Sequence, residues 1–336
     1  MPLPKMLSAS LLVSLMVMSD AALSQEYVLK FSVPAPPAED AANTMFKQFA
    51  ELVEGRSGGK IDVQFYYGGQ LGPIPSVIEG VAMGTVEMSI QLTGFLAALD
   101  PRYSVLDAPG LFEDEAHANR VFRDPQVRAM VSGFGTNTST EVLMLFTAGE
   151  LALASKNPIR GTADFKGIKV RTGGATPLVN LPLEKLGASP VSFSLGEVLP
   201  AIQTGVLDAG VANLQTFLGF KFADVAPHVT YLPGSVMAAS ALISRDFLDK
   251  IGPELAAVVK SSAADAFPVY DQMIPADKQR FEAIWQKAGG TINEFGKDEA
   301  QAYLQVVFQA ADEIVSSNAQ LADDYKILRD AAERLK

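Results

Sequence analysis

Cysteine is absent from the 336-residue sequence, and histidine occurs only twice, as His117 and His228. Without cysteine the chain has no disulfide, no thiolate nucleophile, no cysteine metal ligand and no lipidated N-terminal cysteine. Neither histidine has a second histidine at metal-ligand spacing, so we expect a surface or capping role for each. P-loop and G-x-G-x-x-G sequences are also missing. We therefore predict no metal, no cofactor and no catalytic residue.

Positive charge is scarce as well. The 27 lysines and arginines are outnumbered by 38 aspartates and glutamates, which gives a formal net charge of −11. Such acidity disfavours nucleic acid and anionic membranes as partners. With 48% hydrophobic residues, the chain is long enough for two domains with substantial cores. We expect a globular protein that does not bind nucleic acid.

The one notable apolar run, Met6–Met18, follows Lys5 and contains three serines. It is shorter than the roughly 20 residues that a membrane-spanning helix needs. The small residues Ala22-Leu23-Ser24 suit signal peptidase. We therefore predict that residues 1–24 are a cleaved secretory signal rather than a membrane anchor. The mature protein is expected to be periplasmic, soluble and not inserted in the membrane.

The start of the mature chain reads as a strand–helix–strand unit. A predicted strand over 26–33 is followed by apolar residues at helical spacing over 42–53 and by alternating apolar residues over 61–65. Such units favour an α/β fold with a largely parallel sheet. The tail, from about Pro253 to Lys336, is mostly helical and is expected to brace the rest.

Two segments resemble each other without a gap, VIEGVAMGTVEMSI (77–90) and VLPAIQTGVLDAGV (198–211). Gly84 and Glu87 of the first match Gly205 and Asp208 of the second. Two α/β lobes of similar build would give this pattern, and a chance match is the alternative, because Gly-x-apolar-acid is common where a helix turns into a strand.

If the repeat is real, the residues beyond its strands are equivalent, with Gln91 and Thr93 in one lobe and Ala212 and Asn213 in the other. Ligands bind beyond the carboxyl ends of strands in open α/β sheets. Two such lobes facing each other would enclose a ligand cleft.

Arg171 ends an alternating run, GIKVR, and is followed by Thr172-Gly173-Gly174 and an expected helix start near Thr176-Pro177. A guanidinium beside a helix N-terminus offers two parallel donors and a positive dipole end, which suit a carboxylate. The alternative is a surface arginine paired with Asp164 or Glu184. The spacing alone leaves both interpretations open.

The order of seven segments resembles that of the solute-binding proteins of tripartite ATP-independent periplasmic (TRAP) transporters, of the dicarboxylate-binding family 7 type. The resemblance runs from about residue 27 to the C-terminal helices. Its most specific parts are D-x-K-G-x-K-x-R (164–171) and E-V-x-x-A-I-Q-T-G-V-x-D (197–208). The segments are LKFSVPA, YYGGQLG, GTVEMSI, LDAPGLFEDEAHA, ADFKGIKVRTGG, LGASPVSFSLGEVLPAIQTGVLD and ALISRDFLDKI.

The resemblance implies a non-enzymatic, two-lobed periplasmic binding protein fold, with a largely parallel sheet flanked by helices in each lobe. We expect residues 25–150 and about 238–280 to form the first lobe, and 151–237 and about 281–336 the second. It also implies that Arg171 grips the carboxylate of an organic acid, which the protein delivers to TRAP-type membrane permease subunits.

Further ligand-binding residues are expected around Arg171. Asn213 stands one place later than the ligand-facing asparagine of many family members, and a second family arginine is replaced near Gly149-Glu150-Leu151. With apolar residues at predicted cleft positions, a monocarboxylate with a sizeable apolar or neutral body is expected rather than a small dicarboxylate. Those apolar residues are Leu92, Leu151, Leu195 and Ala212. The predicted ligand-binding set is Arg171, Asn213, Gln91, Thr93, Glu150, Leu195 and Phe217.

Two other functions are compatible with parts of this pattern. An extracytoplasmic hydrolase could use Glu150 and a second cleft carboxylate as acid and base, but the sequence offers no convincing pair with separated pKa values. A ligand-loaded sensor subunit would have the same features as a transport protein, because only the partner differs.

Overall fold

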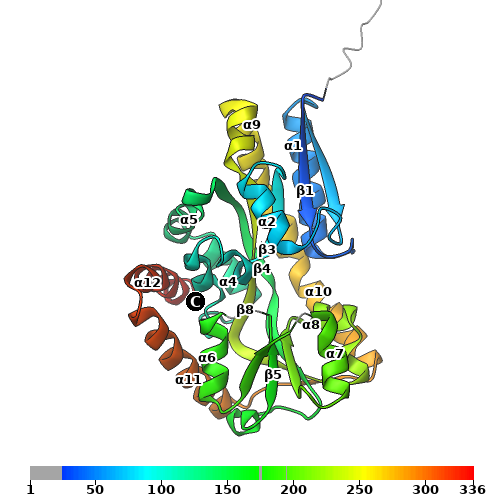
Figure 1. Cartoon of the computed structure of the whole chain (residues 1–336), viewed down its shortest axis with the longest axis vertical. Helices are drawn as coiled ribbons and strands as arrows, with labels where there is room; N and C mark the ends of the chain where they lie inside the picture. Colours follow the sequence, from blue (N-terminus) through cyan, green and yellow to red (C-terminus); the bar gives the residue numbers. More distant parts are fainter. Residues whose placement is uncertain (1–24, 174–175, 194) are drawn as a thin grey trace, which may run out of the picture.

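The computed structural model describes residues 25–173, 176–193 and 195–336 (Figure 1). The predicted signal sequence, residues 1–24, lies outside the described residues. Within the described chain, no helix combines the length and the hydropathy that crossing a bilayer requires.

One mixed sheet of nine strands runs through the molecule in the order β2-β1-β3-β8-β4-β7-β5-β6, with β9 paired to β8. Three strands at each end of this order are parallel to one another, and β4 and β8 pair antiparallel between them. The strands are β1 (Tyr27–Val33), β2 (Ile61–Tyr67), β3 (Met88–Leu92), β4 (Thr140–Ser155), β5 (Lys169–Thr172), β6 (Ser189–Ser192), β7 (Ala209–Ala212), β8 (His228–Ser244) and β9 (Thr291–Asn293).

We call the part built on β1, β2 and β3 the first lobe and the part built on β5, β6 and β7 the second lobe (Figure 1). Each lobe contains a parallel strand group covered by helices on both faces, so the predicted α/β fold is confirmed. The two long strands β4 and β8 extend from one lobe into the other and join the two groups into one sheet.

Helices cover the sheet in four apolar clusters, two in each lobe. The α-helices are α1 (Ala41–Arg56), α2 (Ile74–Ala82), α3 (Thr93–Leu96), α4 (Glu115–Phe122), α5 (Pro125–Ser132), α6 (Pro177–Lys185), α7 (Leu195–Gln203), α8 (Leu214–Gly219), α9 (Arg245–Asp265), α10 (Phe267–Lys287), α11 (Lys297–Ser316) and α12 (Ala319–Arg334). Short 3-10 helices are η1 (Pro101–Asp107), η2 (Thr136–Thr138), η3 (Thr162–Phe165) and η4 (Phe222–Asp224).

The repeat found in the sequence is a structural repeat. Its copies form α2 followed by β3 and α7 followed by β7, each with a glycine at positive φ between helix and strand, Gly84 at 70° and Gly205 at 79°. The acidic residue then accepts a hydrogen bond from a strand backbone of the same lobe. Glu87 accepts from the Lys30 amide at 3.0 Å, and Asp208 accepts from the Lys169 amide at 2.8 Å. The same sequence phrase therefore builds the same local structure twice.

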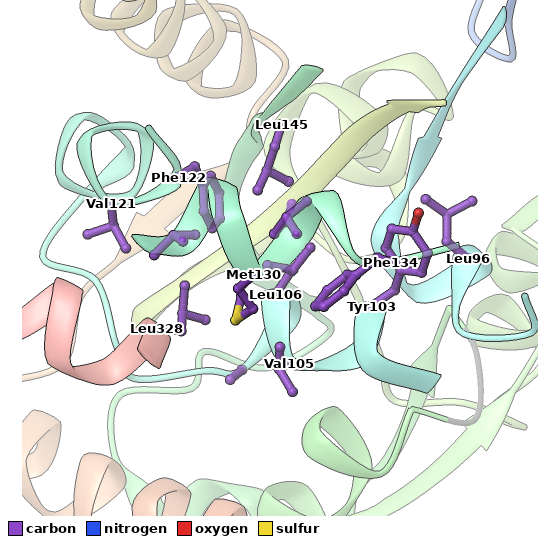
Figure 2. Packing of buried hydrophobic residues seen from close by; sticks show 14 of the residues in the cluster. Leu96, Tyr103, Val105, Leu106, Val121, Phe122, Met130, Phe134, Leu145 and Leu328 are labelled. Atoms are coloured by element: carbon purple, nitrogen blue, oxygen red, sulfur yellow. The ribbon is translucent and has the colours of Figure 1, made fainter. Parts of the chain in front are cut away.

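The C-terminal helices tie the two lobes together. Tyr270 of α10 packs in a first-lobe cluster, whereas Trp285 at its other end packs in a second-lobe cluster. Helix α11 returns from the second lobe, and α12 packs on the first lobe against α4, α5 and η1. Figure 2 shows Leu328 of α12 in this cluster with Met130 and Phe122. The expected division into lobes stays a proposal, and these contacts favour placing α12 with the first lobe.

Candidate ligand-binding site

Arg171 is the last but one residue of β5, near the carboxyl ends of the parallel strands of the second lobe. Its side chain is buried, with 7% of the residue exposed. Its Nε donates to the Phe193 carbonyl at 3.0 Å, and its Nη1 donates to the Val211 carbonyl at 3.2 Å. These two carbonyls, which follow β6 and belong to β7, fix the plane of the guanidinium.

The guanidinium is a buried charge that pairs with no carboxylate of the described part of the chain. Burial lowers the pKa of Arg171 from its ordinary value, and no carboxylate of the described residues offsets that effect. An arginine nevertheless stays charged in a protein. Of the two earlier alternatives, Asp164 accepts from the backbone amides of Arg160 and Gly161, and Glu184 is exposed. The structure therefore does not support the surface ion pair, and the contact of Arg171 with a carboxylate ligand stays a prediction.

Gly173 lies beside the guanidinium. A Cβ at residue 173 would lie 3.7 Å from both Nη1 and Nη2 of Arg171. A longer side chain there would extend over the two terminal nitrogens, which are the donors that bind a carboxylate as a pair. Glycine at residue 173 therefore places no side chain beside these two nitrogens.

The strand ends of the two lobes face each other. Gln215 of α8 donates from Nε2 to Asp40 Oδ2, next to α1, at 2.7 Å. On another part of the same edge, a Cβ on Gly94 of α3 would lie 3.7 Å from Thr176 Cγ2. Because residues beyond the carboxyl ends of both strand groups meet at these two points, the region between them is the candidate ligand cleft.

Gln91 lines a cavity of about 170 Å³ at the strand ends of the first lobe. Its residue is 2% exposed, and its Nε2 donates to Ser89 Oγ at 2.8 Å. Its Oε1 has no hydrogen-bond partner among the described residues. The cavity is lined by Ser32, Pro34, Gly68, Gly69, Gly72, Pro73, Ile74, Val77 and Gln91.

Four other predicted residues have contacts inside the protein. The Thr93 hydroxyl lies 2.7 Å from Asp107 Oδ1, and Phe217 packs in the second-lobe core beside Phe222 and Trp285. Asn213 caps α8 by accepting from the Thr216 amide at 2.8 Å and donates to the Ala148 carbonyl. Leu195 begins α7 and packs partly buried on the second-lobe core. These contacts give the first three residues structural roles, and their contact with a ligand stays a prediction.

Glu150 lies elsewhere, in the segment where β4 passes between the lobes. It pairs with Lys278 Nζ of α10 at 2.5 Å, and this ammonium lies 4.8 Å from the centre of the Tyr231 ring. The pair lines a cavity of about 230 Å³ with residues 231–236. Arg171 is not among the lining residues of this cavity. Glu150 therefore has a cationic partner of its own, and its predicted role at the ligand stays without support.

The two histidines have structural contacts. His228 Nδ1 lies 2.8 Å from the Thr291 hydroxyl. His117 is fully buried, its Nδ1 accepts from the Glu113 amide at 3.0 Å and its Nε2 lies 2.9 Å from the Ala332 carbonyl. The second contact joins α4 to α12. Of the two roles expected, a surface position does not hold for His117, because the last helix covers it. Its contact with the Glu113 amide at the start of α4 fits the other, a capping role.

The sequence did not predict that Ser32 and Lys278 line the two cavities. Lys278 is 128 residues from Glu150, and no sequence signal joins them. A sequence comparison could have identified Ser32. The segment LKFSV (29–33) aligns with IKVRT (168–172), and in this alignment Ser32 is equivalent to Arg171. The sheet register agrees with this match, since Ser32 pairs with Ser89 on β3 and Arg171 pairs with Gly210 on β7.

Comparison with known proteins identifies the family of the chain. A sequence model of the family described as bacterial extracellular solute-binding protein, family 7, matches residues 32–318. The chain is 26% identical over 254 residues to the 2,3-diketo-L-gulonate-binding periplasmic protein of Escherichia coli K12, covering 74% of this chain and 76% of that relative. It is 23% identical over 303 residues to the C4-dicarboxylate-binding periplasmic protein of Rhodobacter capsulatus, covering 89% and 90%.

Solved structures share the fold. A TRAP periplasmic solute-binding protein from Desulfovibrio salexigens with bound orotic acid superposes with a TM-score of 0.84 at 20% identity, covering 92% of this chain and 100% of that chain. The family match spans most of the sequence, and the structural match extends over both lobes. The chain therefore belongs to family 7 of the bacterial extracellular solute-binding proteins, the binding subunits of TRAP transporters, and it is a binding protein rather than an enzyme.

Proposed function

We propose that the protein captures an organic monocarboxylate between its lobes and that Arg171 binds the carboxylate through two parallel hydrogen bonds. The observation that carries this proposal is a buried guanidinium, oriented by two backbone carbonyls, with no carboxylate of the described chain to neutralise it. Guanidinium and carboxylate match in shape and charge, and burial strengthens their attraction. The names of the relatives give different acids as their ligands, so the acid that this protein binds is to be identified by experiment.

The setting of this capture is the periplasm, where the protein delivers its ligand to a TRAP-type membrane permease. The family match and the apolar run at Met6–Met18 support secretion, with cleavage after Ser24. Delivery requires that the lobes close on the ligand and open at the permease, and β4, β8 and α10 are the segments across which they would bend.

Arg171→Ala is expected to weaken binding of the carboxylate by about 30-fold to several-thousand-fold, because a buried charge is left without its partner at roughly 2–5 kcal/mol. Arg171→Lys should restore only part, since an ammonium lacks the two parallel donors. The measurement is titration calorimetry, with acids found by mass spectrometry of the purified protein and by a thermal-shift screen of mono- and dicarboxylates.

Arg160→Ala is the matched control, because Arg160 is an exposed arginine of the same lobe. It should leave the affinity unchanged. If Arg171→Ala bound the acid within about threefold of the wild type, less than ~0.7 kcal/mol, Arg171 would not be the carboxylate anchor. If the neutral amide of the acid bound as tightly as the acid, the charge would not be what the protein recognises.

A further inference from the structure

The cavity beside Gln91 occupies the place in the first lobe that the Arg171 side chain occupies in the second. Ser32 and Arg171 are equivalent on the central strands β1 and β5. Ser32 pairs with Tyr66 and Arg171 with Val191, so Gly68 is the equivalent of Phe193. Phe193 supplies a carbonyl to Arg171, whereas Gly68 lines the cavity. Serine in place of arginine therefore leaves room where the guanidinium would lie.

This cavity lies at the carboxyl ends of the first-lobe strands. Its lining comes from β1, β3 and the segments that follow β1 and β2, which are parallel and end at the same side of the sheet. Asp40, which accepts from Gln215 of the second lobe, follows the same strand β1. A ligand held on Arg171 thus meets the cavity from across the cleft.

The lining determines what chemistry fits. All of its side chains are uncharged, so a second carboxylate would be buried there without a cation. Gln91 is buried and leaves one end of its carboxamide without a partner among the described residues. A hydroxyl both donates and accepts, so it satisfies that end whichever way the amide is turned. The volume of about 170 Å³ is several times the ~30 Å³ of one water molecule and admits a short hydroxylated fragment.

We infer that the ligand is a hydroxylated monocarboxylate, whose carboxylate binds Arg171 and whose distal hydroxyl enters the first-lobe cavity beside Ser32 and Gln91. This inference rests on the proposed function and narrows its substrate class. Asymmetry between the equivalent positions, arginine in one lobe and serine in the other, gives the ligand a charged end and a neutral end.

The test compares straight-chain acids with and without hydroxyls, from glycerate and propanoate up to gluconate and hexanoate, by titration calorimetry. We expect at least one hydroxylated acid to bind about tenfold or more tightly than the alkanoate of the same length, because the alkanoate leaves Gln91 unpaired. Gln91→Leu should reduce that preference below about threefold by weakening the hydroxylated acid alone. Ser32→Ala should reduce it in the same direction.

Ser240→Ala is the matched control. Ser240 pairs with Gln91 across the sheet, is buried and has a hydroxyl without a partner among the described residues, but it is not a lining residue of the cavity. This variant should keep the preference. Equal binding of both series in the wild type, a preference unchanged in Gln91→Leu and Ser32→Ala, or binding of none of these acids would overturn the inference. Arg171→Ala should weaken every acid that binds, and its failure to do so would overturn the proposed function instead.

Discussion

Arg171 and Glu115 are ionisable side chains that burial affects in opposite ways. Burial lowers the pKa of Arg171, which still stays charged, and raises the pKa of Glu115 to about 7. The negative charge of Glu150 also raises the pKa of Glu115, and Thr147 Oγ1 donates to its Oε2 at 3.1 Å. The arginine therefore stays charged, whereas Glu115, near the lobe connection, takes up a proton close to neutral pH.

Glu115 makes stability depend on pH. Between its ordinary pKa of 4.5 and about 7, the unfolded chain gives up a proton that the folded chain keeps. The contribution of this group to the free energy of unfolding therefore falls as the pH rises through that window. Glu115→Gln removes the titration and retains an oxygen for Thr147. We expect equal Tm at pH 4 and a variant that melts a few degrees higher at pH 8, about 1–3 kcal/mol, by calorimetry.

Glu113→Gln is the control for this comparison, because Glu113 is an exposed glutamate beside α4. It should shift Tm equally little at both pH values. A Glu115→Gln variant that is destabilised at pH 8, or stabilised equally at pH 4 and pH 8, would contradict the assignment.

For single residues, the residue type suggested what a side chain could bind but not which neighbours it contacts in the fold. For Arg171 the sequence left a surface ion pair and a carboxylate contact open, and the resemblance to the TRAP binding proteins favoured the second. Asn213 and Phe217 were placed at the ligand; Asn213 caps a helix and Phe217 packs in a core, and their contact with a ligand stays a prediction. Caps and core contacts depend on the exact turn that a chain takes, which residue type alone does not determine.

The two copies of the repeat each have a glycine between helix and strand, Gly84 and Gly205, and these two positions can be compared directly. A Cβ at Gly205 would meet nothing within 4 Å, whereas one at Gly84 would lie 3.3 Å from Asp246 Cβ. Both glycines have positive φ, which an alanine adopts at roughly 1 kcal/mol. We expect Gly205→Ala to lower the free energy of unfolding by about that amount and Gly84→Ala by more, measured by urea denaturation.

Gly205→Asn provides the control, because asparagine tolerates positive φ better than alanine does. It should destabilise less than Gly205→Ala. Equal effects of alanine at both glycines would show that the contact with Asp246 does not matter.

Elements were predictable where their signal is local. The segments 26–33, 42–53 and 61–65 became β1, α1 and β2, because hydrophobic periodicity acts within a few residues. The antiparallel strands β4 and β8 were not predicted, although they join the lobes. Each passes from one core to another along its length, so its apolar pattern does not reveal which partner it pairs with.

The whole molecule is expected to move as two lobes. The hydrogen bond between Gln215 and Asp40 joins the two lobes at the edge of the cleft. We therefore expect this bond to form when the lobes approach each other. We expect ligand to reduce the radius of gyration in small-angle X-ray scattering and to raise Tm by mass action. Gln215→Ala should weaken affinity by about three- to tenfold, because one hydrogen bond to a charged group is lost.

The exposed Gln126 offers a control position outside the cleft. Gln126→Ala should leave affinity and contraction unchanged. A scattering profile that is the same with and without saturating ligand would argue against lobe closure, and an unchanged affinity in Gln215→Ala would show that this bond does not contribute to it.

The position of α12 has a consequence for the order of folding. Its Leu328 lies in the first-lobe cluster with Phe122 (Figure 2). Ala332 of the same helix and Val77 belong to this cluster as well. Trp285 and Val307 complete the two clusters of the second lobe. A chain emerging from the ribosome therefore cannot finish either core until its last helices have been made. We therefore expect the cores of both lobes to be completed late in folding, when α10, α11 and α12 pack onto the strands.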